Sequence, residues 1–241
     1  MICVISTGPG GIDEITPKAL DALNECEIIS GYSRYIELIR SHFPGKTFMS
    51  YSMRQELKRC HDALALSREH KNVALISGGD SGVYGMAGLM LEAASGSCEE
   101  IRIIPGITAA NSCAAILGAP LMNDYATISL SDLMTDWKII ERRLICACEG
   151  DFVICIYNPA SNHRPDNFVR ACEIMIHHGK DENTVAGYVR NAGRGGEFMK
   201  VTTLGEIMNE NIDMLCTVII GNSKTYVSSE GKMITPRGYE L

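Results

Sequence analysis

Three short glycine-rich segments hold the residues whose types and spacing could do chemistry. They are TGPGG at 7–11, GGDSGVYG at 78–85 and PGITAAN at 105–111. Glycine-rich turns after strands usually bind anionic groups through their bare backbone N–H groups. The second segment, however, contains Asp80, and no Lys or Arg occurs between Lys71 and Arg102. An acid in such a loop repels a di- or triphosphate, but it suits hydroxyls, an ammonium or a sulfonium. S-adenosylmethionine has all three.

The common nucleotide-binding glycine motifs do not fit these segments. A dinucleotide fingerprint, G-x-G-x-x-G, opens directly into a helix, and an acid follows about 20 residues later at the end of the next strand. Here residues 12–16 separate Gly11 from the expected helix start at Pro17, and the next strand ends at Ser30. A G-x-x-x-x-G-K-[ST] loop does not occur in the sequence. Nicotinamide-dependent and nucleotide triphosphate chemistry are therefore disfavoured.

Strand-like and helix-like runs alternate through the first half of the chain. The strand-like runs are MICVIST, EIIS, VALIS and IRIIP, and helices are expected from Pro17, over 54–70 and over 84–95. Thr16 before Pro17 is a favourable helix start, with Thr as N-cap. Alternation of this kind predicts parallel strands joined by helices. The three glycine segments each follow a strand, so we expect them to share the carboxyl edge of one sheet, where ligands bind.

A domain boundary is expected after the helix-like run TAANSCAAIL at 108–117, which is closed by Gly118 and Pro120. The chain then divides into domains 1–118 and 119–241. Beyond the boundary come strand-like runs YATISLS, FVICIY, TVAGYVRN, FMKVTT and CTVIIG, with helices over 136–148, 165–178 and 204–210. Some of these strands follow one another without a helix, which indicates a mixed sheet. The tail, 225–241, is predicted to be a hairpin or an arm. The predicted fold class is α/β, with two α/β domains, the first sheet mostly parallel and the second mixed.

Composition narrows the classes of partner and compartment. The chain has 241 residues and a net charge of −7, with Lys and Arg scattered, which argues against nucleic-acid binding. Its ten cysteines include no C-x-x-C pair, so neither a metal site nor a cluster is predicted, and reduced thiols indicate a cytoplasmic protein. The N-terminus has no signal-peptide pattern, and no apolar run approaches the ~20 residues of a membrane span.

VISTGPGGIDEIT, LISGGDSGVYG and PGITAANSCAAILGAPL together resemble the tetrapyrrole methylase family of S-adenosylmethionine-dependent enzymes. The match in order and spacing extends over essentially the whole chain. SLSDLMTDW at 129–137, IYNPASNHR at 156–164 and YVRNAGRGGE at 188–197 are similar to the branch that methylates precorrin-3B at ring carbon 17. The resemblance implies a cofactor cleft between two α/β domains, a tetrapyrrole substrate, ring contraction and cobalamin biosynthesis. Family analogy also implies a homodimer.

The resemblance assigns cofactor contacts to matching positions of this chain, with S-adenosylhomocysteine as the product. They are Pro9, Gly78, Gly79, Asp80, Val83, Thr108 and Ala109 in the first domain, and Asn158 and Ala192 in the second.

Candidates for substrate binding and proton transfer are less fully determined. Arg164, Arg190 and Arg194 are predicted to bind substrate carboxylates, with surface solvation as the equal alternative. Asp132 is the first candidate for a general acid or base, ahead of Tyr125 and His163; it could equally be a helix N-cap. Methylation at carbon 11 or 20, or a non-catalytic protein that binds S-adenosylmethionine or a corrinoid, stays open as an alternative.

Overall fold

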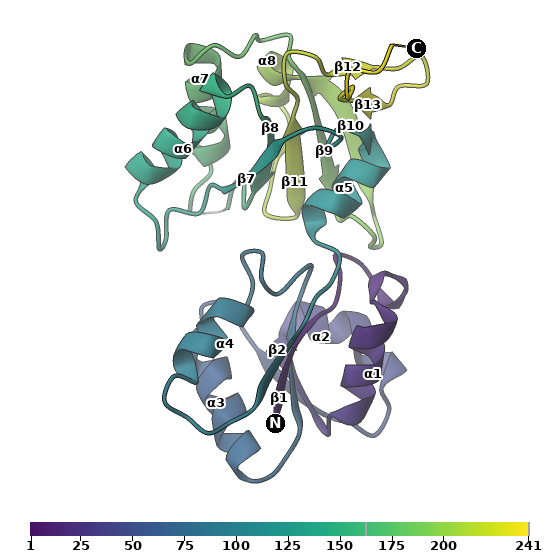
Figure 1. Ribbon diagram of the computed structural model, residues 1–241, viewed down its shortest axis with the longest axis vertical. Helices are drawn as coiled ribbons and strands as arrows, with labels where there is room; N and C mark the ends of the chain where they lie inside the picture. The colour runs from purple at the N-terminus through teal and green to yellow at the C-terminus, as the bar shows by residue number, and fades with distance from the viewer. Residues whose placement is uncertain (162, 241) are drawn as a thin grey trace. The chain divides into compact units, whose positions relative to one another are not determined.

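The computed structural model describes residues 1–161 and 163–240, which form two compact units, Met1–Ala109 and Ala110–Leu241 (Figure 1). The division falls after the first residue of α5 (Ala109–Leu117), whereas the sequence indicated a boundary at 118/119. The difference has a packing reason. Ala110, Cys113 and Leu117 of α5 are buried against the sheet of the second unit, so the helix belongs to that core.

The first unit contains a five-stranded sheet in the order β3-β2-β4-β1-β5, and every strand pair in it is parallel. Its strands are β1 (Ile2–Ser6), β2 (Ile28–Tyr32), β3 (Thr47–Tyr51), β4 (Val73–Ser77) and β5 (Ile101–Ile104). The predicted parallel sheet is therefore confirmed. The sequence analysis did not predict β3 or the helix α2 (Ser33–Ile39).

Helices cover both faces of this parallel sheet. On one face, α1 (Pro17–Glu25) and α2 pack against Cys3 and Ile5; on the other, α3 (Glu56–Arg68) and α4 (Ala87–Ala93) pack against Ile2 and Val4 (Figure 1). Alternate residues of β1 thus fill two separate cores. The Thr16 hydroxyl accepts a hydrogen bond from the Ala19 N–H at 3.2 Å and caps α1, as predicted. Two 3-10 turns, Ile12–Glu14 and Arg40–His42, complete the unit.

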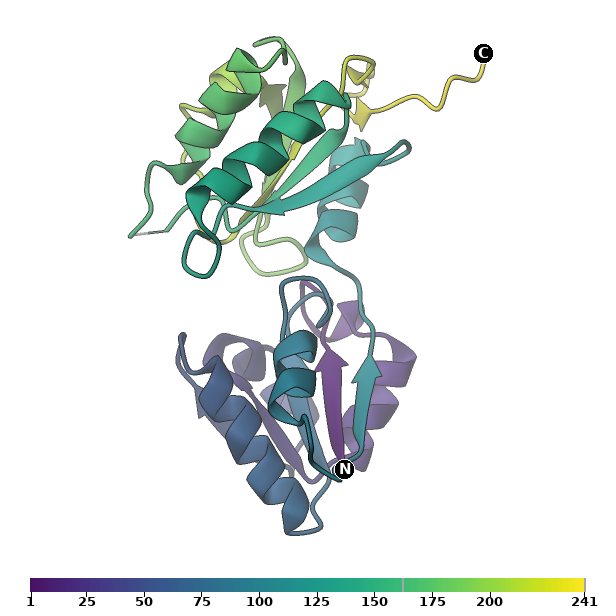
Figure 2. The same ribbon diagram turned by 60° about the vertical axis from the view of Figure 1, so that its left-hand side comes forward.

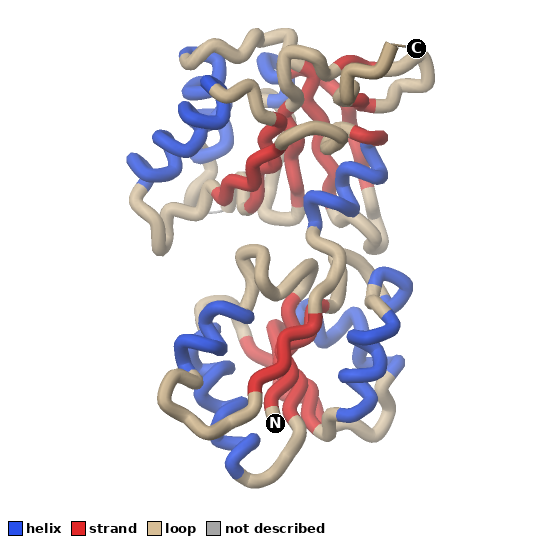
Figure 3. Tube along the Cα trace, in the orientation of Figure 1, coloured by secondary structure: helices blue, strands red, loops and turns tan. Residues whose placement is uncertain are grey.

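The second unit contains a five-stranded mixed sheet in the order β10-β9-β11-β8-β7. Figure 3 draws its strands in red and its helices in blue. Its strands are β7 (Tyr125–Ser129), β8 (Val153–Tyr157), β9 (Val185–Arg190), β10 (Phe198–Thr203) and β11 (Cys216–Ile220). Within this sheet, β7 and β8 pair in parallel and the other three pairs are antiparallel, which confirms the predicted mixed sheet. One face is covered by α6 (Trp137–Glu149), α7 (Asn167–His177) and α8 (Leu204–Ile207), and the other by α5 (Figure 2).

The tail forms the predicted hairpin, which joins a small sheet of its own. β12 (Tyr226–Val227) pairs with β13 (Met233–Ile234), and β13 pairs in parallel with β6 (Gly118–Ala119).

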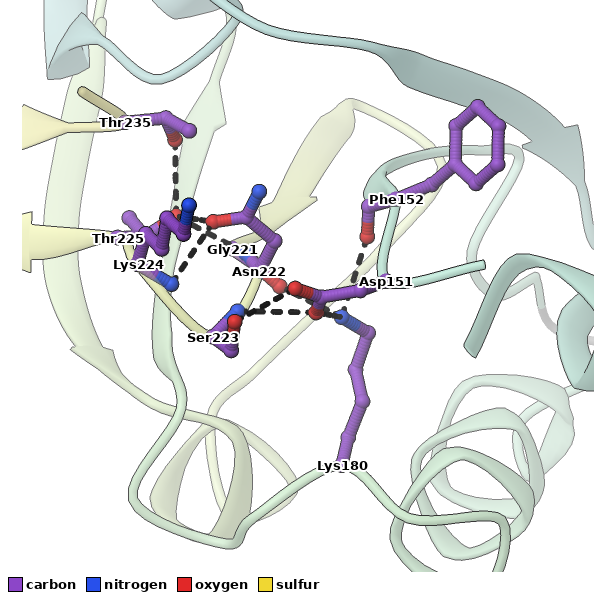
Figure 4. A network of polar contacts seen from close by, with 9 residues as sticks. All are labelled: Asp151, Phe152, Lys180, Gly221, Asn222, Ser223, Lys224, Thr225 and Thr235. Carbon is purple, nitrogen blue, oxygen red and sulfur yellow. Dashed lines mark hydrogen bonds and ion pairs between the residues drawn. The ribbon is translucent and has the colours of Figure 1, made fainter. Parts of the chain in front are cut away.

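A buried lysine fastens the start of β8 to the end of β11 (Figure 4). Lys180 Nζ donates hydrogen bonds to the carbonyl oxygens of Phe152 at 3.1 Å and Gly221 at 2.8 Å. Asp151 Oδ1 lies 4.0 Å from the same nitrogen and accepts from the Ser223 N–H. Burial lowers the pKa of Lys180, because water is excluded from its charged form. The cation therefore has a structural role in holding the strands that precede the tail.

Candidate functional site

The three glycine loops lie side by side on the first unit. β4, β1 and β5 are neighbours in a parallel sheet, so the loops that follow them share its carboxyl edge. Two loops are joined directly: the Gly8 N–H donates to the Gly79 carbonyl at 3.1 Å, and the Gly79 N–H donates to the Gly8 carbonyl at 2.7 Å. The predicted gathering of TGPGG, GGDSGVYG and PGITAAN is confirmed within this unit.

A buried serine pair adds a second connection that the sequence analysis missed. Ser6 Oγ accepts from the Ser81 N–H at 2.8 Å and lies 3.0 Å from Ser81 Oγ. Both side chains are buried. A serine at the end of a strand gives no distinctive sequence signal, because serine is common at turns whether or not it has a distant partner.

Asp80 connects the second and third loops. Its Oδ1 accepts from the Gly82 N–H at 2.8 Å, and its Oδ2 accepts from the Gly106 N–H at 2.9 Å. Hydrogen bonds to a carboxylate are the stronger kind, so this side chain fixes two loops against each other. The sequence suggested that the charge would face a ligand; the structure directs both oxygens to backbone donors.

Close contacts explain why three positions in these loops are glycine. A Cβ at Gly8 would lie 2.4 Å from the Glu14 carbonyl oxygen. One at Gly78 would lie 2.5 Å from the Tyr35 ring, and one at Gly106 would lie 2.6 Å from Ser6 Cβ. A side chain at any of these positions would force the contacting atoms to move.

The residues predicted to contact the cofactor divide between the units. Seven lie on the glycine loops or directly after them in the first unit: Pro9, Gly78, Gly79, Asp80, Val83, Thr108 and Ala109. Asn158 and Ala192 belong to the second unit.

A second group of loops lies on one edge of the mixed sheet. β8 and β9 both run antiparallel to β11, and β7 runs parallel to β8, so β7, β8 and β9 end at the same edge. Asn158 directly follows β8 with φ 50°, and its Nδ2 donates to Ser129 Oγ at 2.9 Å. Ala192 is buried and follows Asn191, which has φ 56°. Non-glycine residues with positive φ are uncommon and concentrate at functional sites.

The candidate arginines Arg190 and Arg164 form hydrogen bonds within the protein. Arg190 donates from Nε at 3.1 Å and from Nη2 at 2.9 Å to Asp213 Oδ2, and this interaction holds the pKa of Arg190 above its ordinary value. Arg164 donates from Nε to Ser161 Oγ at 3.2 Å and from Nη1 to the Leu130 carbonyl at 3.3 Å. Arg194 is half-buried on the loop after β9. The bound arginines therefore offer fewer donors to a substrate than the sequence suggested.

The three candidates for proton transfer occupy different positions. Asp132 lies at the shared edge, with its side chain 35% exposed and Oδ1 3.8 Å from Arg164 Nε. It does not cap α6; Asp136 does so, accepting from the Lys138 N–H at 2.8 Å. Tyr125 begins β7 and lies at the opposite edge of the sheet, whereas His163 is exposed in the turn after β8. Asp132 thus follows β7 at the edge that also holds Asn158.

The described residues show no group of three or more His, Cys, Asp or Glu side chains that could hold a metal ion. Within the same residues, no helix has the length and apolar character needed to cross a membrane. All ten cysteines are free thiols.

The chain is similar to known proteins along its length. A family model described as Tetrapyrrole (Corrin/Porphyrin) Methylases matches residues 1–208. A probable cobalt-factor III C(17)-methyltransferase of Salmonella typhimurium is 46% identical over 243 residues, covering 100% of both chains. A precorrin-3B C(17)-methyltransferase of Sinorhizobium sp is 36% identical over 245 residues, covering 98% of this chain and 96% of the relative.

Solved structures agree in fold. The crystal structure of the methyltransferase CobJ superposes with a TM-score of 0.91 at 34% identity, covering 98% of this chain and 99% of that one. A uroporphyrin-III C-methyl transferase from Thermus thermophilus, complexed with S-adenyl homocysteine, has a TM-score of 0.69 at 17% identity and covers 91% of each chain. At that identity the likeness concerns the fold alone.

Proposed function

This chain belongs to the tetrapyrrole (corrin/porphyrin) methylase family, and from that premise we propose that it methylates carbon 17 of a precorrin-3-level macrocycle. The methyl donor is S-adenosylmethionine, and the reaction contracts the ring to the precorrin-4 level in cobalamin biosynthesis. The observation that carries the proposal is full-length identity of 46% with a relative that is named for methylation at this carbon.

The cobalt-containing macrocycle is the proposed substrate. Relatives named for cobalt-factor III reach 46% and 42% identity, whereas the relative named for cobalt-free precorrin-3B reaches 36%. Cobalt is then part of the substrate, and the protein needs no metal ligands of its own.

The glycine loops fit S-adenosylmethionine. They present backbone groups at a sheet edge, contain no Lys or Arg, and are fixed to one another by Gly8, Gly79 and Asp80. When bound, the cofactor supplies an electrophilic methyl group on a sulfonium. The loops position the donor and exclude water, and positioning of this kind is worth ~7–11 kcal/mol of the barrier.

The residues of the second unit have proposed roles of their own. Asn158 and Ala192 contact the cofactor, and Arg194 binds a substrate carboxylate. Asp132 is the proposed general acid or base for the proton movements of ring contraction, because its side chain is 35% exposed and it follows β7 at the edge that also holds Asn158.

The test uses the purified chain with S-adenosylmethionine carrying a ¹³C-labelled methyl group, under anaerobic conditions. We expect label at carbon 17 and release of one S-adenosylhomocysteine per turnover, with cobalt-factor III preferred over precorrin-3B. Label at carbon 11 or carbon 20 would assign the chain to another methylase of the family. Tight cofactor binding without release of S-adenosylhomocysteine would identify a binding protein.

We also propose a cytoplasmic homodimer. Ten free thiols favour a reducing compartment, and the dimer follows the family analogy. Light scattering should give about twice the chain mass of 26.3 kDa, and cell fractionation should recover the protein with cytoplasmic markers. A monomeric mass would contradict the proposed dimer. Recovery of the protein outside the cytoplasmic fraction would contradict the proposed location.

A further inference from the structure

The loop Leu130–Asp136, between β7 and α6, has a fixed base. Leu130 is fully buried, and its N–H donates to the Tyr157 carbonyl at 2.9 Å. Its carbonyl accepts two hydrogen bonds, from Asn167 Nδ2 at 3.0 Å and from Arg164 Nη1 at 3.3 Å. A carbonyl held by two side-chain donors anchors the residues that follow it.

The tip of the same loop is apolar and exposed. Leu133 is 65% exposed and Met134 is 92% exposed. Single exposed apolar residues are ordinary. Two adjacent ones on an anchored loop form an apolar surface, and covering that surface lowers the free energy of the system. The loop follows Ser129, whose Oγ accepts from Asn158 Nδ2, so it leaves the sheet at the same edge as the proposed cofactor contact.

The size and surroundings of the surface indicate what covers it. A stable protein interface uses roughly 20–30 residues on each side, far more than these two residues provide. A tetrapyrrole has flat apolar faces and a rim of carboxylates, so an apolar loop tip of two side chains can contact one of its faces. Arg164 and Arg190 already bind Leu130 and Asp213, so these two guanidinium groups have fewer donors left for the carboxylates of such a ligand.

We propose that Leu133 and Met134 are substrate-contact residues that bind a face of the tetrapyrrole macrocycle, and that Arg164 and Asn167 are positioning residues for their loop. This inference rests on the proposed function, because it takes the tetrapyrrole as the ligand. It differs from the initial hypothesis for Arg164, which acts here through Leu130 instead of through a substrate carboxylate.

The test compares the double variant L133S/M134S with the wild type, using cobalt-factor III. A matched control, L91S/M122S, also removes one Leu and one Met, each 49% exposed, from α4 and from the segment before β7. The KM for the macrocycle should rise about tenfold or more in L133S/M134S, with kcat for bound substrate largely retained. The control should match the wild type, and the Kd for S-adenosylmethionine should change by less than about twofold in both variants.

Binding is also measured without turnover. Trp137 is the single tryptophan of the chain and directly follows the loop, so its fluorescence reports a macrocycle bound there. Wild-type quenching without methylation at carbon 17 would refute the proposed function and leave the inference standing. Equal quenching curves for L133S/M134S and the wild type would overturn the inference whatever the turnover. A halved mass of L133S/M134S in light scattering would also overturn it, because a second copy would then cover the loop.

For the positioning residues, we compare R164K with R164Q. The structure predicts that both raise the KM for the macrocycle, because neither side chain can reach Ser161 and Leu130 with a guanidinium fork. If the KM for the macrocycle stayed at the wild-type value in R164K but rose in R164Q, Arg164 would act through its charge on the substrate. That result would contradict the positioning role.

Discussion

Replacing Asp80 tests whether its carboxylate holds the loops or faces the ligand. Asp80→Ala removes the two oxygens that accept hydrogen bonds from the Gly82 N–H at 2.8 Å and from the Gly106 N–H at 2.9 Å. A hydrogen bond to a charged group contributes about 1.5–3 kcal/mol. Of these two hydrogen bonds, the one to Gly106 joins the second loop to the third, and the one to Gly82 stays within the second loop. If cofactor binding requires that alignment, losing it should weaken affinity by about 10- to 100-fold, since 1.4 kcal/mol corresponds to a factor of ten.

The decisive assay is calorimetric titration with two ligands. S-adenosylmethionine carries a sulfonium charge, and S-adenosylhomocysteine does not. Because loop alignment serves both ligands, Asp80→Ala should weaken both by a similar factor. Asp80→Asn should resemble Asp80→Ala, because its amide can accept from one N–H group but turns a donor towards the other.

Asp181→Ala is the matched control, because Asp181 Oδ1 accepts from the Asn183 N–H at 2.7 Å within its own turn. It should leave both affinities unchanged. A loss of affinity in Asp80→Ala for S-adenosylmethionine alone would refute the reasoning, because it would show that the carboxylate acts on the sulfonium charge. Unchanged affinity for both ligands would show that the loops stay aligned without Asp80.

Three further predictions concern stability. Gly106→Ala places a Cβ 2.6 Å from Ser6 Cβ and should lower the free energy of unfolding by about 1–3 kcal/mol in urea titrations. The control Gly88→Ala, with open space around its Cβ, should not lower it. Equal unfolding midpoints for the two variants would show that the loops can shift to accommodate the methyl group. Burial raises the pKa of the Cys113, Cys155 and Cys172 thiols to about 12, so their stabilising contribution is complete below the ordinary value of 9.0 and is lost as pH rises towards 12. Unfolding free energy should fall by up to about 1.4 kcal/mol per pH unit per thiol, and Cys155→Ala should make this slope shallower by one proton; an unchanged slope contradicts the assignment. Lys180→Met leaves the Phe152 and Gly221 carbonyls without their donor and should cost about 2–4 kcal/mol of unfolding free energy, which an unchanged denaturation midpoint would disprove.

Local sequence signals predicted the elements and the glycine edge well. Thr16 and Pro17 marked the start of α1 correctly, and alternation of strands and helices indicated the parallel sheet. The loops could be grouped because parallel strands end at one edge. These inferences depend on short-range pattern or on topology, and both are visible in the order of residues.

The failures involve contacts between residues distant in sequence. α5 ends at Leu117, directly before Gly118, as predicted, but its small-residue face packs on the second sheet, and helix periodicity does not say which sheet a helix covers. The partners of Asp80 and Arg190 could not be inferred either. Gly106 and Asp213 reach them only through the fold, and a lone acid or glycine gives no sign of its partner.

The pairing of β13 with β6 bears on the order in which the two units can form during synthesis. The parallel sheet of the first unit is complete once β5 has been made, and its contacts all lie within residues 1–109. β6, in contrast, waits for Met233 and Ile234, which leave the ribosome more than a hundred residues later. The first unit can therefore fold while translation continues, as N-terminal domains commonly do. In the second unit, α5 can pack on the mixed sheet once β11 has been made, but Met233, which completes that core, and the strand partner of β6 arrive only with the hairpin.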